Sequence, residues 1–125
     1  MTAGTLELFD ASWKNATSVT VTALEGDATL KLSTKLAAAD VPANKFFTRK
    51  AFGLVLTDGE GTAKLDLAEG VFETADTFVL NGKAMSGGCT YGSSASPADV
   101  KDDVHFAGKG VVRVAHPCGG LLIVR

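Results

Sequence analysis

Short apolar runs alternate with polar side chains along much of the chain and stop at glycine-containing turns. Over residues 17–24, hydroxyl and aliphatic side chains alternate, which directs every second side chain to the same face of an extended strand. After the turn residues Glu25-Gly26-Asp27, the alternation resumes over residues 29–32. The two runs therefore predict a pair of antiparallel strands joined by a short loop.

The densest strand pattern lies between Ala51 and Leu80. Short apolar runs follow one another there, and the turn residues 58–61 and 69–70 interrupt them. Such spacing predicts a meander of short strands. Asn81-Gly82 comes directly afterwards and is a residue pair that two-residue β-hairpins favour, so we expect a further hairpin at that point.

Three segments break the strand pattern. Residues 35–50 combine an alanine-rich stretch with a proline and predict a helical turn or an ordered loop. Residues 86–96 are rich in glycine and serine and predict an exposed loop, and Ser96-Pro97 is a start signal for a short helix that runs to residue 103. The chain closes with strands predicted at 110–114 and 121–124.

Length and composition fit one small β-rich domain. A chain of 125 residues can bury one modest core, and 14 glycines against 3 prolines favour turns and short strands over long helices. We therefore predict a mainly β fold of short antiparallel strands with one or two short helices. Residues 17–125 form the single domain, and residues 1–16 precede it as an N-terminal arm or edge strand.

The charge pattern narrows the classes of partner. The chain has 12 basic and 14 acidic residues and a formal net charge of −2, without a basic block that could neutralise a run of phosphates. We therefore expect no nucleic-acid partner. The start of the chain lacks the features of a signal peptide, and no apolar stretch is long enough to span a bilayer, so we expect a soluble, cytosolically synthesised protein without a membrane partner.

The two cysteines and two histidines suggest chemistry only weakly. His116 and Cys118 could form a nucleophile pair, but a loop histidine beside a small, half-buried thiol explains the same residues. A zinc site from Cys89, His105, His116 and Cys118 would have suitable ligands but lacks the paired short spacings of such sites. We expect free thiols, no metal site and no cofactor.

Several carboxylates lie close together in sequence and could serve as an acid and a base. Most of them lie beside turn glycines or on the predicted short helix, where solvated turn carboxylates are the commoner explanation. We therefore expect no enzyme activity from the group Asp58, Glu60, Glu69, Glu73, Asp99, Asp102 and Asp103.

The strand-and-turn order carries a family resemblance. The run Gly53-Leu54-Val55-Leu56-Thr57-Asp58, the charged run over residues 63–67, and Glu69-Gly70-Val71-Phe72-Glu73 resemble the middle of small decoration, or cement, proteins of tailed-bacteriophage capsids. The closing runs 110–114 and 122–125 are similar to that family's last strands. About half of the chain takes part in the resemblance.

This resemblance implies a compact β-barrel or β-tulip without enzyme activity. It implies a homotrimer on the outside of a virion, bound to the major capsid protein and stabilising the shell. It also implies an N-terminal arm that adds to a sheet of the capsid protein. Another virion component, such as a tail or fibre module, would fit the same strand pattern, and a small cysteine hydrolase is the third alternative.

The N-terminal run offers the residues that such an arm would use. Its alternation presents apolar side chains together with backbone donors and acceptors, and the chain's only tryptophan follows closely. A first strand packed on its own domain would show the same alternation, and core burial would explain the tryptophan equally well. The expected capsid-binding residues are Thr5, Leu6, Glu7, Leu8, Phe9 and Trp13.

Overall fold

Strands supply nearly all of the regular structure, which confirms the mainly β class. The fold is described by a computed structural model over residues 3–14, 17–47 and 52–115. A single 3₁₀ turn, η1 (Ala38–Asp40), lies among the described strands. The strands are β1 (Gly4–Phe9), β2 (Ser18–Ala23), β3 (Ala28–Ser33), β4 (Gly53–Asp58), β5 (Ala63–Leu67), β6 (Phe72–Ala75), β7 (Thr77–Leu80), β8 (Lys83–Ala84), β9 (Thr90–Gly92), β10 (Val100–Lys101), β11 (Phe106–Gly108) and β12 (Val111–Val114).

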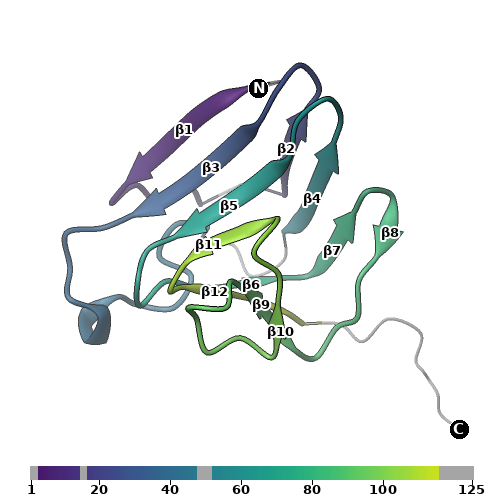
Figure 1. Ribbon diagram of the computed structural model, residues 1–125. Helices are drawn as coiled ribbons and strands as arrows, with labels where there is room; N and C mark the ends of the chain where they lie inside the picture. Colours follow the sequence, from purple (N-terminus) through teal and green to yellow (C-terminus); the bar gives the residue numbers. More distant parts are fainter. Residues whose placement is uncertain (1–2, 15–16, 48–51, 116–125) are drawn as a thin grey trace, which may run out of the picture.

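The described strands form three four-stranded sheets (Figure 1). The first has the order β1-β3-β5-β11, the second β2-β4-β7-β8 and the third β10-β9-β12-β6. Consecutive strands of the N-terminal half therefore fall in different sheets, and each strand pairs in parallel with one from a later turn of the chain. The chain winds as a stack of coils, each of which adds a strand to more than one sheet.

The predicted antiparallel hairpin and the predicted meander are therefore wrong. Glu25-Gly26-Asp27 and residues 58–61 turn the chain through a corner between two sheets, and the second corner stacks on the first. The Gly61 amide donates to the Ala23 carbonyl at 3.2 Å, and the Thr62 amide donates to Asp27 Oδ1 at 2.9 Å. Alternation shows which side chains of a strand point inward, but it does not show which strand is its hydrogen-bonding partner. Here the partner strand belongs to the next coil. A closed barrel is not seen among the described strands.

Two local predictions are confirmed. Asn81 and Gly82 join β7 to β8 in an antiparallel hairpin, and their φ angles of 52° and 80° are those of a tight two-residue turn. The helical turn expected within residues 35–50 is η1. The predicted strand over residues 110–114 corresponds to β12, whereas the one over residues 121–124 lies outside the described residues.

The predictions for residues 86–103 are wrong in two respects. The expected loop contains β9, whose Tyr91 is buried, and the expected helix is replaced by turns and β10. The Ser96 hydroxyl accepts a hydrogen bond from the Ala98 amide at 3.3 Å, as a helix cap would. The Asp99 amide then bonds to Thr90 Oγ1 at 2.9 Å, so the chain continues beside β9 instead of entering a helix.

Ladders of apolar side chains fill the interior of the coil stack. One ladder runs from β1 through β3 and β5 to β11, and the exposed fraction of its side chains falls steadily along it. The values are 44% for Leu6, 6% for Leu30, 3% for Leu65 and 1% for Phe106. The ladder is therefore open at its β1 end, whereas Phe106 at the β11 end is covered and packs against the Phe78 ring. Within the described residues, no helix has the length and apolar character needed to cross a membrane.

Candidate functional site

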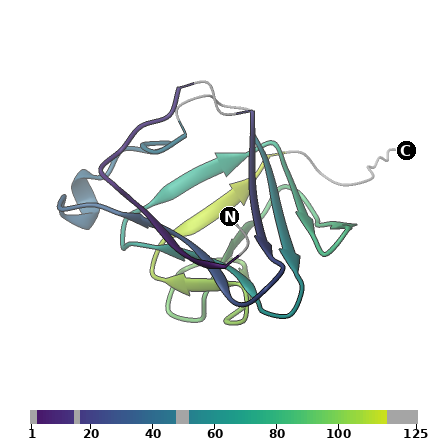
Figure 2. The same cartoon turned by 90° about the horizontal axis from the view of Figure 1, so that it is seen from above.

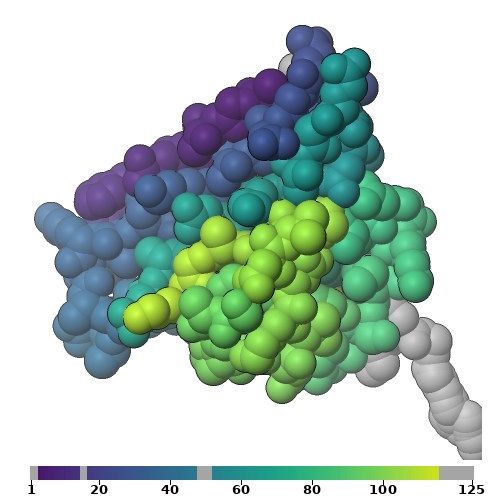
Figure 3. Space-filling view, viewed as in Figure 1, coloured from purple at the N-terminus to yellow at the C-terminus, as the bar shows by residue number. Residues whose placement is uncertain are grey.

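The open end of the coil stack lies at β1 and β2. Among the described residues, β1 pairs only with β3 and β2 pairs only with β4, so the outer edge of each strand has no strand partner there. From above, β1 and β2 lie in front of later strands (Figure 2), and β1 forms the upper left border of the face in Figure 3. Such edges present backbone donors and acceptors that a further strand can use.

An apolar groove lies between these two strands. Its volume is about 270 Å³, and its floor consists of the last rungs of the inner ladders. The residues that line it, here called the end groove, are Leu6, Leu8, Trp13, Ser18, Val19, Thr20, Val21, Leu30 and Phe47. None of these side chains carries a charge.

The residues expected to bind a partner divide between two faces of β1. Leu6 and Leu8 line the end groove together with Trp13, whose exposed fraction is 47%. Alternation places the other three on the outer face of the sheet: Thr5, Glu7, which accepts a hydrogen bond from the Ser33 hydroxyl, and the exposed Phe9. The alternative of a first strand on its own domain is thus what the structure shows for residues 4–9, with one free edge.

The remaining groove residues were not anticipated as a site. Val19, Val21 and Leu30 have an inward pattern that predicts core residues, and only their position in the first two coils leaves them next to an open end. Phe47 comes from the irregular segment after η1, where no periodic pattern marks it. The sequence signal that would have found them is the order of the coils, which alternation does not reveal.

A short segment, residues 44–47, builds one wall of the end groove. The Trp13 amide donates to the Phe46 carbonyl at 2.6 Å, and the Trp13 and Phe47 rings meet edge to face with centroids 6.1 Å apart. The Phe47 ring also contacts Phe52, at a centroid distance of 4.9 Å. Trp13 therefore depends on this segment for its position.

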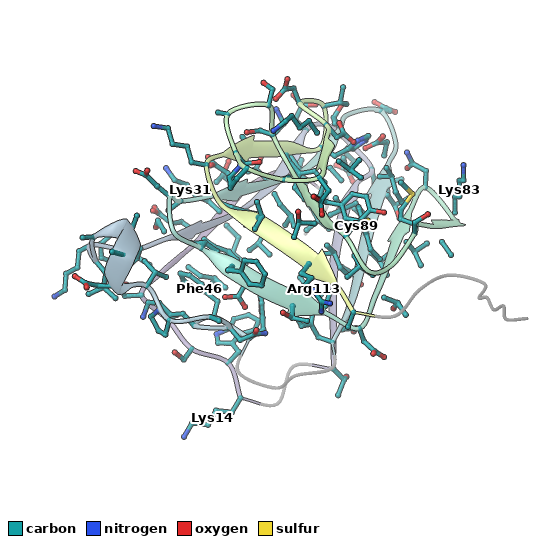
Figure 4. The ribbon with its side chains drawn as sticks, turned by 90° about the horizontal axis from the view of Figure 1, so that it is seen from below. Lys14, Lys31, Phe46, Lys83, Cys89 and Arg113 are labelled. Carbon is teal, nitrogen blue, oxygen red and sulfur yellow. The ribbon has the colours of Figure 1, made fainter. Side chains whose placement is uncertain are left out.

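Glu73 of β6 holds the same segment from inside the protein. Its two carboxylate oxygens accept hydrogen bonds from the consecutive amides of Phe46, at 3.2 Å, and Phe47, at 3.0 Å. The side chain is 1% exposed, and Phe46 lies at the face of the β6–β12 pair in Figure 4. Burial raises the pKa of Glu73 to about 7, although the amides and the charge of Lys45 oppose the rise. The interpretation of Glu73 as a solvated turn carboxylate is wrong.

No protein-family model, curated protein or solved structure matches the chain.

A histidine with two carboxylate partners forms a second polar cluster, away from the end groove. His105 Nε2 lies 2.8 Å from Asp58 Oδ2, and His105 Nδ1 lies 2.8 Å from Asp102 Oδ2. Burial lowers the pKa of His105, but its two carboxylate partners outweigh this effect and leave the pKa above its usual value. Both ring nitrogens are engaged, so the ring acts as a tie between the end of β4 and the loop before β11.

The other predicted chemical groups are dispersed. Within the described ranges, no three histidine, cysteine or carboxylate side chains are placed to hold a metal ion. Cys89 is a half-buried free thiol whose Sγ lies 3.4 Å from the Ser86 carbonyl oxygen. His116 and Cys118, needed for the nucleophile pair and for the zinc site, lie outside the described residues. Asp103 accepts a hydrogen bond from the turn amide of Ser94, in agreement with the turn interpretation, whereas Asp99 accepts one from the amide of Thr90 in β9.

Proposed function

We propose that the protein is a non-enzymatic component of a bacteriophage particle that binds the outer surface of the capsid and stabilises the shell. The observation that carries this proposal is the end groove, an uncharged hollow between two strand edges in which the apolar side chains of Leu6 and Trp13 remain about half exposed. The strand-and-turn resemblance to capsid decoration proteins supplies the kind of partner.

The geometry favours an extended segment of the major capsid protein as the occupant of the end groove. An added strand would satisfy backbone groups on the outer edge of β1 or β2 and would place alternate side chains over Leu6 and Val19. The side chains that line the groove are uncharged, and Ser18 and Thr20 add hydroxyl groups to an otherwise apolar lining. A partner segment with apolar or hydroxyl-bearing side chains therefore fits best. Many weak copies on one shell would then act together through avidity. The resemblance to capsid decoration proteins further implies that these copies are arranged as homotrimers.

Co-sedimentation with capsid shells tests the proposal. Shells prepared without this protein, from the phage whose genome encodes it, are mixed with the wild type and with two serine variants. Leu6→Ser changes the end groove, whereas Val104→Ser changes an apolar side chain that is at least as exposed, 58% against 44%, and lies outside that groove. We expect Leu6→Ser to weaken binding about tenfold or more, the loss of about 1.4 kcal/mol of apolar contact, while Val104→Ser binds like the wild type.

Equal binding by the wild type and Leu6→Ser would exclude the end groove as the binding surface. The number of copies per particle distinguishes the proposed role from its alternative. Roughly hundreds of copies would agree with decoration of a shell that relies on avidity, whereas a few copies would indicate a tail or fibre component. Sedimentation equilibrium of the free protein measures whether it is a trimer.

A further inference from the structure

Glu73 lies directly behind the wall of the end groove. Phe47 lines the end groove on one side and a small internal cavity of about 10 Å³ on the other, and Glu73 lines that same cavity. The carboxylate contacts the backbone of the wall at two successive amides, those of Phe46 and Phe47. A change in the protonation of this carboxylate therefore reaches the groove wall directly, through its hydrogen bonds to the Phe46 and Phe47 amides.

The wall in turn positions the exposed tryptophan. The Phe46 carbonyl accepts the hydrogen bond from the Trp13 amide, and the Phe47 ring meets the Trp13 ring edge to face. Asn44 fixes the other end of the segment, because its side-chain amide donates to the Phe47 carbonyl at 3.1 Å and its Oδ1 accepts from the Thr74 amide at 3.3 Å. The Asn44 amide also donates to the Phe72 carbonyl at 2.8 Å, so residues 44–47 are tied to β6 at three consecutive residues, Phe72, Glu73 and Thr74.

Two amide donors directed at one carboxyl group favour its ionised form. A carboxylate only accepts hydrogen bonds, whereas a carboxylic acid carries a hydroxyl hydrogen that would face one of the two amide donors. Hydrogen bonds to an ionised acceptor are also about twice as strong as those between neutral groups. Protonation of Glu73 would therefore loosen at least one of the contacts that hold Phe46 and Phe47.

Among the described residues, Lys45 is the cationic side chain that acts on Glu73. It lowers the pKa of Glu73 through its backbone amide and its charge, and it also pairs with Asp10 at 3.4 Å. The strands β2, β3, β4, β5 and β12 present only apolar side chains to the small cavity, and Val112 is the partner of Glu73 in the β6–β12 register. The neighbouring Arg113 is exposed. Burial among these side chains raises the pKa of Glu73 to about 7, so its charge changes near neutral pH.

We propose that Glu73 is a positioning residue for the end groove and that its ionised form holds Phe46, Phe47 and Trp13 in the arrangement that binds the capsid segment. Docking therefore strengthens as Glu73 loses its proton. This inference rests on the proposed function for the identity of the occupant, whereas the link between Glu73 and Trp13 is a property of the isolated protein.

The fluorescence of Trp13 tests the link without any partner, because the chain has a single tryptophan. We expect its emission to change between about pH 5.5 and about pH 8.5 with a midpoint near that of Glu73. Glu73→Gln should abolish the change, whereas His105→Asn, which alters the second polar cluster away from the end groove, should retain it. A flat wild-type titration would overturn the inference, and so would an unchanged titration in a folded Glu73→Gln variant.

Shell binding as a function of pH tests the consequence. For a group that titrates near 7, the ionised fraction rises from about one tenth at pH 6 to about nine tenths at pH 8, so the apparent affinity should rise about tenfold. Glu73→Gln should lose this pH dependence. Binding that is equal at both pH values would overturn the inference but leave the proposed function intact. If Trp13 titrates as expected but no shell binds at any pH, the proposed function fails while the link between Glu73 and the groove stands.

Discussion

The buried carboxylate of Glu73 predicts that the protein becomes less stable as the pH rises through neutrality. Its pKa is about 7 in the folded protein and 4.5 in a solvated chain, so the folded state holds the proton more tightly than the unfolded state. A group of this kind contributes stability that is complete below about pH 4.5 and is lost as the pH rises through about 7.

The magnitude follows from the difference between the two pKa values. A shift from 4.5 to about 7 corresponds to about 3 kcal/mol in the free energy of unfolding, most of which is lost between about pH 5 and about pH 8. His105 adds to the same trend, because its raised pKa contributes stability that is complete below 6.5 and is lost as the pH rises through the folded value. Asp58 and Asp102 have lowered pKa values, so the stability that they contribute is lost only as the pH falls below about 3.8.

Urea denaturation followed by far-UV circular dichroism measures the effect, since the fluorescence of Trp13 is itself expected to depend on pH. Glu73→Gln should remove most of the difference between the two pH values, while His105→Asn should retain the part that belongs to Glu73. At about pH 5 the wild type and Glu73→Gln should agree within about 1 kcal/mol, because a protonated carboxyl and an amide are similar in size and charge. A wild-type stability that is constant or rises between the two pH values would refute the reasoning.

Two further predictions concern the stacking of the coils. Leu65→Ala should cost about 3 kcal/mol because Leu65 is a buried rung, whereas Leu6→Ala on the same ladder should cost about 1 kcal/mol or less because it is half-exposed; equal losses in urea denaturation would contradict the open-ended ladder. Gly61→Ala should destabilise more than Gly82→Ala, as thermal melting would show. A Cβ at Gly61 would lie 2.1 Å from the carbonyl carbon of Gly26, whereas Gly82 faces open space and an alanine there costs about 1 kcal/mol in backbone strain at its φ of 80°. The reverse order would argue against stacked corners.

Alternation predicted most strands and their inward faces but not their partners. Val19 and Val21 point inward as the sequence pattern indicates, because a period of two depends only on which side of the strand is buried. An antiparallel hairpin and a corner between two sheets both require a short turn after Val21 and Ala23, so the turn residues do not distinguish them. The discriminating contact is between the two corners themselves, where Gly61 lies against Gly26. That contact is distant in sequence and carries no periodic signal.

The candidate site was predictable to a similar degree. Leu6, Leu8 and Trp13 could be selected because alternation and aromatic character mark a binding segment. Phe47 could not, since its role depends on a wall that residues 44–47 form only when they reach β6. Glu73 was misassigned because Glu69-Gly70 nearby indicates a turn, whereas its actual partners are amides 26 and 27 residues away.

Two features in the same region of the molecule lower its stability: the exposed apolar side chains of the end groove and the buried carboxylate of Glu73. The outermost rungs of a coil stack gain little from burial on their exposed side, and polar end coils are what solubility favours in repeat proteins. Leu6 and Trp13 are apolar there, and the wall beside them depends on a buried carboxylate that costs stability above neutral pH. Such local conflicts with the rest of the fold are typical of functional sites. Because both conflicts converge on the Phe46–Phe47 wall, we infer that this wall is the place where partner binding and protonation meet.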